Sequence, residues 1–242
     1  MAKKEKRKSP LRGPVRQKSN NMTIKYDDIV AFDPLTANQE KACDAWDEGD
    51  NLVLTGTAGT GKTFLAMSLA MEAVLDEDTL QDKVVIIRSI VATRDPGHLP
   101  GTKQEKEEAF TSPYKALCTQ IFEDTGAYGK LISSNKLEFE STSFIRGLTW
   151  DNAVIVVDEM QNLNFHELDT VITRVGRECR IIFSGDYKQT DFRHEDEKSG
   201  IMKFLNILEQ MKDFTIVTYG WEDIVRSDFV RDYIMTKEML GY

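Results

Sequence analysis

The chain has 242 residues, of which 40% are hydrophobic and 29% are charged, and its formal net charge is −9 at pH 7. These values fit a globular protein of one large or two small domains with a sizeable core. No apolar run approaches the roughly 18 residues of a membrane span, and no apolar stretch follows the charged N-terminus, which excludes a membrane protein and a secretory signal. The three cysteines are too scattered for a disulfide framework or a zinc site, so we expect a cytoplasmic protein.

Charge is distributed unevenly along the chain. Residues 1–18 contain eight basic side chains and one acidic side chain, a net charge of +7, which leaves −16 for the remainder. We expect residues 1–21 to form a basic disordered tail. Such a tail either contacts nucleic-acid phosphates or is simply solvated, and both interpretations stay open.

Predicted strands alternate with predicted helices along the rest of the chain. In order they are helix 35–48, strand 51–55, helix 64–75, strand 84–88, a loop over 93–113 with one helical turn, helix 114–124, strand 137–144, strand 153–157, helix 165–175, strand 180–183, helix 200–211, strand 214–219 and helix 223–240. This alternation predicts a single α/β domain over residues 22–242, in which a parallel sheet has helices on both faces.

A glycine-rich loop joins the first predicted strand to the next helix. It reads GTAGTGKT and fits the phosphate-binding pattern GxxxxGK[ST]. Its residues are Gly56, Thr57, Ala58, Gly59, Thr60, Gly61, Lys62 and Thr63. Glycines let the backbone N–H groups curl around a phosphate, while Lys62 reaches the β- and γ-phosphates and Thr63 binds Mg²⁺. A glycine-rich surface turn is the alternative, but the strand–loop–helix context favours a site for ATP and Mg²⁺.

Two carboxylates follow the apolar run AVIVV at residues 153–157. After a phosphate-binding loop, such a pair at a strand end predicts the second half of a nucleotide hydrolysis site. Asp158 would hold the magnesium shell, and Glu159 would act as general base toward the attacking water. An acidic pair in an ordinary strand-to-loop connection is the alternative.

The strand at residues 180–183 leads into the polar sequence SGDYKQ. An amide just beyond a strand end can sense the γ-phosphate, which makes Gln189 a candidate sensor. Gly-Asp is equally good turn chemistry, so spacing alone does not decide between a sensor and a turn.

Several further blocks give the chain a resemblance to the PhoH family of ATPases, in the short form found in bacteria and phages. They are GTAGTGKT (56–63), HLPGT (98–102), FIRGLTW (144–150), VIVVDEMQN (154–162), TRVG (173–176), SGDYKQTD (184–191), SGI (199–201) and EDIVRSDFV (222–230). The resemblance covers roughly residues 35–235. It implies a RecA-like P-loop core related to superfamily-1 helicases, ATP hydrolysis, oligomeric rings and a link to RNA metabolism.

The resemblance also implies roles for individual residues. Gln39 matches an adenine-reading glutamine, although its position three residues after Thr36 equally suits a capping box. Gln161 would couple nucleotide state to a bound strand, and Gln189 becomes the favoured γ-phosphate sensor. Arg226 is the first candidate for an arginine finger, followed by Arg174 and Arg146, and a surface salt bridge is the alternative for each.

A single RecA-like lobe lacks the second lobe from which superfamily-1 helicases supply a catalytic cation. We therefore expect a homo-oligomeric ring, with a hexamer as the form to test, in which neighbouring subunits complete each site. One functional hypothesis is an ATPase that remodels single-stranded RNA or DNA, without a membrane partner. The other is a nucleotide-dependent switch or scaffold for a protein partner, which the acidic body keeps open. A small-molecule kinase is disfavoured because Glu159 beside Asp158 suits water activation.

Overall fold

A computed structural model describes residues 23–89, 103–186 and 195–241 of the chain. The predicted basic tail and the candidate sensor Gln189 lie outside these residues. Among the described residues, no helix is both long enough and apolar enough to cross a bilayer.

Six parallel strands form one sheet, which confirms the predicted architecture. The strands are β1 (Asn51–Gly56), β2 (Lys83–Arg88), β3 (Leu137–Ser141), β4 (Ala153–Val157), β5 (Arg180–Ser184) and β6 (Phe214–Tyr219). Their order in the sheet is β3-β2-β4-β5-β1-β6. Every pairing is parallel, so all carboxyl ends lie at one edge of the sheet.

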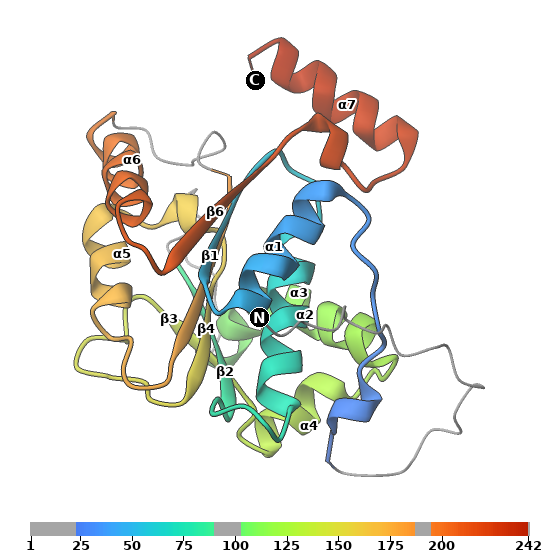
Figure 1. Cartoon of the computed structure of the whole chain (residues 1–242), viewed down its shortest axis with the longest axis vertical. Helices are drawn as coiled ribbons and strands as arrows, with labels where there is room; N and C mark the ends of the chain where they lie inside the picture. Colours follow the sequence, from blue (N-terminus) through green and yellow to red (C-terminus); the bar gives the residue numbers. More distant parts are fainter. Residues whose placement is uncertain (1–22, 90–102, 187–194, 242) are drawn as a thin grey trace, which may run out of the picture.

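Helices cover both faces of this sheet, as expected (Figure 1). One face carries α1 (Ala37–Glu48), α2 (Lys62–Leu75), α3 (Lys103–Phe122) and α4 (Ala127–Ser133), and the other carries α5 (Phe165–Ile172) and α6 (Glu195–Glu209). Side chains alternate between the two cores, so that Leu52 and Leu54 face the first layer while Val53 faces the second. Burial on both faces explains why the inner strands are continuously apolar.

The predicted loop over residues 93–113 is wrong for its second half, because α3 already begins at Lys103 and contains Pro113. The prediction treats proline as a helix breaker. Proline removes only one backbone donor, however, and the preceding sequence KQEKEEA is rich in strong helix formers. The short helix α4 is absent from the predicted elements.

The last predicted helix, 223–240, is also wrong at its start. The structure has a 3-10 turn at Trp221–Asp223, then a connecting segment, and α7 only at Asp228–Met239. The backbone N–H of Val225 donates to the Gly59 carbonyl oxygen at 3.1 Å, which ties this segment to the phosphate loop. A tertiary contact therefore overrides local helix propensity here. Helix α7 projects past the sheet (Figure 1), and none of its residues is buried.

Candidate functional site

The strand order brings three chain segments to one place. Strand β5 lies between β1 and β4, so the carboxyl ends of these three strands are neighbours. Strand β1 leads into the phosphate loop and β4 into Asp158-Glu159. Strand β5 ends at Ser184 and leads into Gly185-Asp186. Ligands of parallel α/β sheets bind at this edge. The predicted residues of the phosphate loop meet Asp158 there, whereas Gln189, predicted beyond β5, lies outside the described residues.

The phosphate loop has the tight backbone that its glycines predict. Gly56, Gly59 and Gly61 have φ angles of 109°, 77° and 82°, in the region that other residues avoid. A Cβ atom on Gly56 would lie 2.2 Å from the Tyr219 carbonyl oxygen, so strand β6 also requires glycine there. Helix α2 starts at Lys62, within the last residues of the loop, and directs its first N–H groups and positive dipole end toward the preceding glycines.

Lys62 is held inside the loop. Its ammonium donates to the carbonyl oxygens of Gly56 at 2.8 Å and Thr57 at 2.7 Å. Burial lowers the pKa of Lys62, and nearby carboxylates oppose this shift, with Asp186 the strongest of them. Phosphate oxygens offer the same kind of acceptor to the ammonium, so Lys62 is placed to exchange loop carbonyls for a nucleotide.

Thr63 and Asp158 meet as predicted for a magnesium site. The Thr63 hydroxyl donates to Asp158 Oδ1 at 3.0 Å, and the Asp158 side chain is buried. A hydroxyl and a carboxylate are hard oxygen donors, and Mg²⁺ in nucleotide sites uses one or two carboxylates together with phosphate oxygens. The donor set therefore fits Mg²⁺.

Glu159 adopts an unusual backbone conformation beside Asp158. Its φ of 52° lies in the left-handed region, which a non-glycine residue seldom adopts and which recurs at functional sites. Burial, followed by the negative charge of Asp158, raises the pKa of Glu159. A raised pKa suits a carboxylate that has to accept a proton near neutral pH.

Gln161 connects Glu159 to the segment after β5. Its side-chain Nε2 donates to Glu159 Oε2 at 2.5 Å, and its Oε1 accepts from the Asp186 backbone N–H at 3.0 Å. A Cβ atom on Gly185 would lie 2.2 Å from the same Oε1, so this close approach depends on glycine. Gln161 thus joins Glu159, the predicted general base, to the segment that follows β5.

Gln39 lies against the phosphate loop. Its backbone N–H donates to Thr36 Oγ1 at 3.3 Å, which is the N-cap half of the predicted capping box. Its side-chain oxygen accepts from the Leu35 N–H instead of the Thr36 N–H, while Nε2 donates to the Thr60 carbonyl at 2.9 Å. Gln39 therefore combines a helix-start role with a contact to the loop, and its role in reading adenine stays a prediction.

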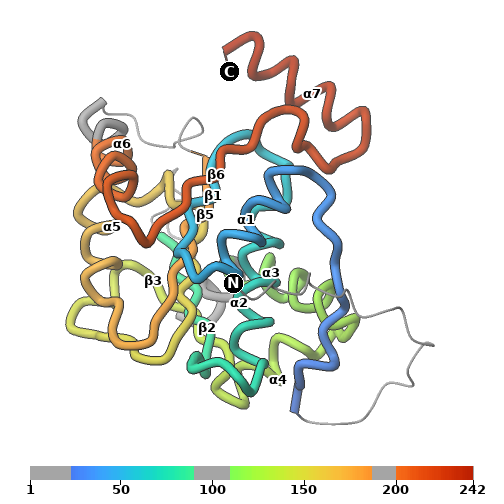
Figure 2. The backbone as a smooth tube through the Cα atoms, viewed as in Figure 1, coloured from blue at the N-terminus to red at the C-terminus, as the bar shows by residue number. Residues whose placement is uncertain are grey.

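The segment that leads into α7 also reaches the phosphate loop (Figure 2). A Cβ atom on Gly59 would lie 3.1 Å from Arg226 Cγ and 3.2 Å from Ile234 Cδ1, so both side chains cover the loop of their own chain. From α7, the Glu238 carboxylate accepts from Trp221 Nε1 at 2.6 Å and from Thr57 Oγ1 at 3.5 Å. Arg226 is therefore placed beside the phosphate loop of its own chain.

The other two candidate fingers lie elsewhere. The Arg174 carbonyl accepts from the Trp150 N–H at 3.1 Å, near the start of β4 and hence at the opposite edge of the sheet. Arg146 is exposed and lines a cavity of about 290 Å³ beside the start of α5. Neither arginine shares the position of Arg226 at the phosphate loop.

Sequence reasoning misses three residues of this site: Tyr114, Asp186 and Glu238. Asp186 lies two residues beyond the end of β5 and is interpreted from the sequence as part of a turn. Tyr114 and Glu238 lie within helices, where no local signal distinguishes them from core or surface residues. The tertiary structure brings Tyr114 to Asp158 and Glu238 to Thr57 of the phosphate loop.

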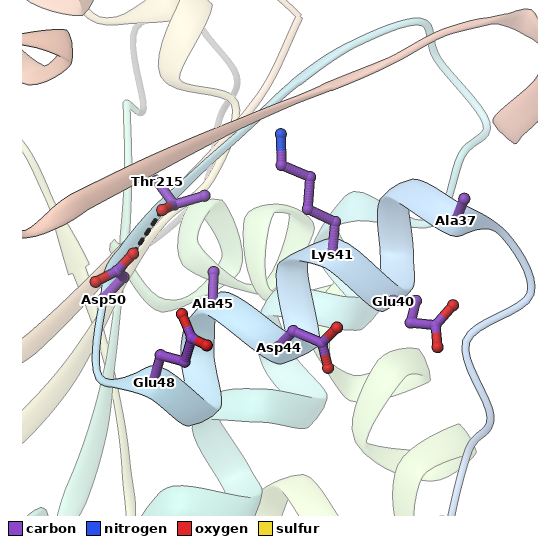
Figure 3. A pocket seen from close by; sticks show the side chains of 8 residues that line it. All are labelled: Ala37, Glu40, Lys41, Asp44, Ala45, Glu48, Asp50 and Thr215. Carbon is purple, nitrogen blue, oxygen red and sulfur yellow. Dashed lines mark hydrogen bonds between the residues drawn. The ribbon is translucent and has the colours of Figure 1, made fainter.

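A second cavity, of about 360 Å³, lies along α1 and near β6 (Figure 3). Its lining includes four carboxylates, from Glu40, Asp44, Glu48 and Asp50, and a single ammonium, from Lys41. This excess of negative charge repels a nucleotide. The cavity is therefore unsuited to ATP, in contrast to the phosphate loop.

Comparisons with known proteins identify the family of the chain. The sequence model of the family described as PhoH-like protein matches residues 31–237. A PhoH-like protein of Mycobacterium leprae is 32% identical over 203 residues, which are 83% of this chain and 57% of the relative. Protein PhoH of Escherichia coli K12 is 33% identical over 175 residues, or 72% of this chain and 49% of the relative. The chain thus spans about half the length of these curated relatives.

A solved structure shares the fold. The large terminase of a thermophilic bacteriophage, in complex with ADP, superposes with a TM-score of 0.51 at 14% identity, over 85% of this chain and 50% of that chain. This similarity concerns the fold alone and confirms the RecA-like P-loop architecture. Since the family match runs through nearly all of the described chain, the protein belongs to the PhoH-like family.

Proposed function

We propose that the protein hydrolyses ATP and uses the energy to remodel single-stranded RNA or DNA. The observation that carries the hydrolysis proposal is the contact between Thr63 Oγ1 and Asp158 Oδ1, with Glu159 next in the chain. It joins the phosphate loop to a pair of carboxylates, which is the arrangement that a nucleotide hydrolase needs.

In the proposed mechanism, the N–H groups of the loop and of the first turn of α2 hold the phosphates of ATP. Lys62 releases its loop carbonyls and donates to the β- and γ-phosphate oxygens. Mg²⁺, held by Thr63 and oriented by Asp158, would neutralise charge on these phosphates. Glu159 accepts the proton of the water that attacks the γ-phosphorus, the bond to the β–γ bridging oxygen breaks, and ADP and phosphate leave.

The link from hydrolysis to a bound strand rests on Gln161. This side chain contacts the base Glu159 and the segment after β5 at once. A change at the γ-phosphate that moves Glu159 would therefore also move this segment. The same connection supports Gln189, a few residues further on, as the γ-phosphate sensor.

A homo-oligomeric ring, of which a hexamer is one form, is part of this proposal. The position of Arg226 at its own phosphate loop removes one reason to require a neighbour. Arg146 is exposed and lies at a different cavity, which makes it a candidate cation for the site of an adjacent subunit. Loss of specific ATPase activity on dilution would support the ring, and an unchanged rate for a monomer would contradict it.

A nucleotide-dependent switch for a protein partner is the second candidate. Helix α7 favours it, because Glu238 and Ile234 contact the phosphate loop while Phe229 and Tyr233 are 82% and 65% exposed. Nucleotide binding at the loop could thereby change the presentation of an apolar helix face.

Steady-state ATP hydrolysis, measured with and without single-stranded RNA and DNA, tests the proposal. Lys62→Ala is expected to abolish nucleotide binding, whereas Glu159→Gln should bind ATP normally but fail to hydrolyse it. Stimulation of the wild type by nucleic acid supports remodelling. A slow rate that is indifferent to nucleic acid supports the switch, and normal hydrolysis by Glu159→Gln would contradict the assigned base.

A further inference from the structure

Tyr114 is a buried polar side chain that the proposed mechanism does not yet use. It lies in α3, and its ring has no exposed surface. Its hydroxyl donates to Asp158 Oδ2 at 2.8 Å. The same hydroxyl interacts with the guanidinium of Arg88, at the end of β2. Tyr114 thus joins a strand end, a helix and the carboxylate beside the phosphate loop.

The two oxygens of Asp158 have different partners. Oδ1 accepts from the Thr63 hydroxyl at 3.0 Å, while Oδ2 accepts from Tyr114. The terminal torsion of an aspartate is soft, so a carboxylate with one partner can rotate. A second partner at Oδ2 fixes the plane of the group and keeps Oδ1 directed at Thr63.

Packing of the Tyr114 ring fixes the position of its hydroxyl, and hence of the hydrogen bond to Asp158. The Tyr114 ring lies 5.8 Å from the Phe139 ring, between centroids, and belongs to the core beneath the sheet. The ring is completely buried, so the hydroxyl is held at this position.

We propose that Tyr114 is a positioning residue for the magnesium site, which acts by orienting the carboxylate of Asp158. The inference rests on the proposed function, because it presumes that Thr63 and Asp158 serve Mg²⁺ with a nucleotide. Residues of this kind typically change metal affinity by about 10–100-fold when they are removed.

The test is calorimetric binding of a non-hydrolysable ATP analogue, in EDTA and over a series of Mg²⁺ concentrations. Tyr114→Phe keeps the ring and removes only the donor. Its affinity in EDTA should equal that of the wild type, while the half-saturating Mg²⁺ concentration rises by about 10-fold or more. Tyr128→Phe, a half-buried tyrosine of α4, is the matched control and should change neither quantity.

A double-mutant cycle separates positioning from a general structural effect. If Tyr114 acts through Asp158, then Tyr114→Phe should have no further effect on the Mg²⁺ dependence in an Asp158→Asn background. Para-aminophenylalanine at position 114, which retains a donor, should restore the wild-type Mg²⁺ dependence and also serves if the phenylalanine variant folds poorly.

Three results would overturn the inference. They are an unchanged Mg²⁺ dependence in Tyr114→Phe, an undiminished effect in the Asp158→Asn background, and a lack of rescue by the aminophenylalanine. Wild-type binding that is equally tight in EDTA and in Mg²⁺ would overturn the proposed magnesium site as well. The failure of the inference alone is thereby distinguished from the failure of the proposed function.

Discussion

Glu159 combines a left-handed backbone conformation with a raised pKa. Its ionised form is disfavoured by burial and by Asp158. The site therefore holds a carboxylate that binds a proton more readily than an ordinary glutamate, at the point where the proposed reaction releases one. Buried acids of this kind are tuned by their surroundings and not by their own chemistry.

A dependence of ATP hydrolysis on pH follows from this shift. As pH falls through the raised pKa, Glu159 becomes protonated and can no longer act as a base, so kcat/KM should fall at a pH above the ordinary glutamate value of 4.5. The Gln161 hydrogen bond lowers this pKa, so Gln161→Leu should move the acid limb to still higher pH. A profile of kcat/KM against pH checks both, and an acid limb at or below 4.5 would contradict the assignment.

Glu238 carries a negative charge, whereas positively charged residues are expected beside a site for phosphate anions. Its carboxylate lies 3.5 Å from Thr57 Oγ1 and interacts electrostatically with Lys62. Glu238→Gln should therefore tighten ATP binding by about two- to fivefold, the size of an interaction between partly exposed charges. Titration with a fluorescent ATP analogue at low and high salt measures this.

The matched control for that charge change is Glu209→Gln, an exposed residue at the end of α6. It alters the net charge equally but lies away from the phosphate loop, so its nucleotide affinity should be unchanged. Equal effects of the two variants would show that net charge, rather than the Glu238 contact, governs binding.

At the scale of helices and strands, the residue after β5 packs very closely against the 3-10 turn Met160–Asn162, which follows β4. Gly185 permits it, since an added Cβ would lie 2.2 Å from Gln161 Oε1 and 2.9 Å from Met160 Cγ. Backbone and side chain must both shift to admit a methyl group there. The hydrogen bond from the Asp186 N–H to Gln161 would be lost with that shift.

Gly185→Ala should therefore reduce the free energy of unfolding by about 1–3 kcal/mol, as overpacking does, and also slow hydrolysis. Gly129→Ala in α4 provides the control, because nothing lies within 4 Å of its added Cβ. That change should raise stability by about 0.5–1 kcal/mol, the helix propensity difference. Denaturant unfolding of both variants tests the pair, and equal effects would contradict the steric explanation.

The sequence predicts most of these elements because each is locally marked. Apolar runs of about five residues mark the inner strands, and glycines at fixed spacing mark the phosphate loop. The start of α3 escapes prediction because Pro113 is a local breaker signal that the helix accommodates. Tyr114 and Glu238 escape it because their partners are 44 and 181 residues away along the chain. Contacts at such separations leave no periodic trace in the sequence.

For the molecule as a whole, the first α-helix and the segment before the last helix both contact the phosphate loop. Gln39 approaches it from the beginning of α1, and Arg226 from the segment before α7. Asn38 and Asp223 join these two regions through a hydrogen bond of 2.7 Å. These two regions thus supply part of the surroundings of the phosphate loop from the same chain, which reduces what a neighbouring subunit would have to contribute.

Mixing experiments can separate contributions within one subunit from those between subunits. Lys62→Ala mixed with Arg226→Ala should recover no activity, because both residues serve the same phosphate loop. Lys62→Ala mixed with Arg146→Ala should recover part of the ATPase rate if Arg146 reaches the site of a neighbour in a ring. Recovery with Arg226→Ala would contradict the arrangement within one subunit, and no recovery with Arg146→Ala would exclude that arginine as the shared residue.

The contact between Trp221 and Glu238 has a practical consequence. The chain has three tryptophans, and two of them, Trp46 and Trp150, are each only 4% exposed and are remote from the phosphate loop. The third indole donates to the same carboxylate that touches Thr57. A nucleotide that displaces the Glu238 carboxylate would change the surroundings of the Trp221 indole and leave those of Trp46 and Trp150 unchanged. Intrinsic tryptophan fluorescence should therefore report nucleotide binding at the phosphate loop without an attached dye.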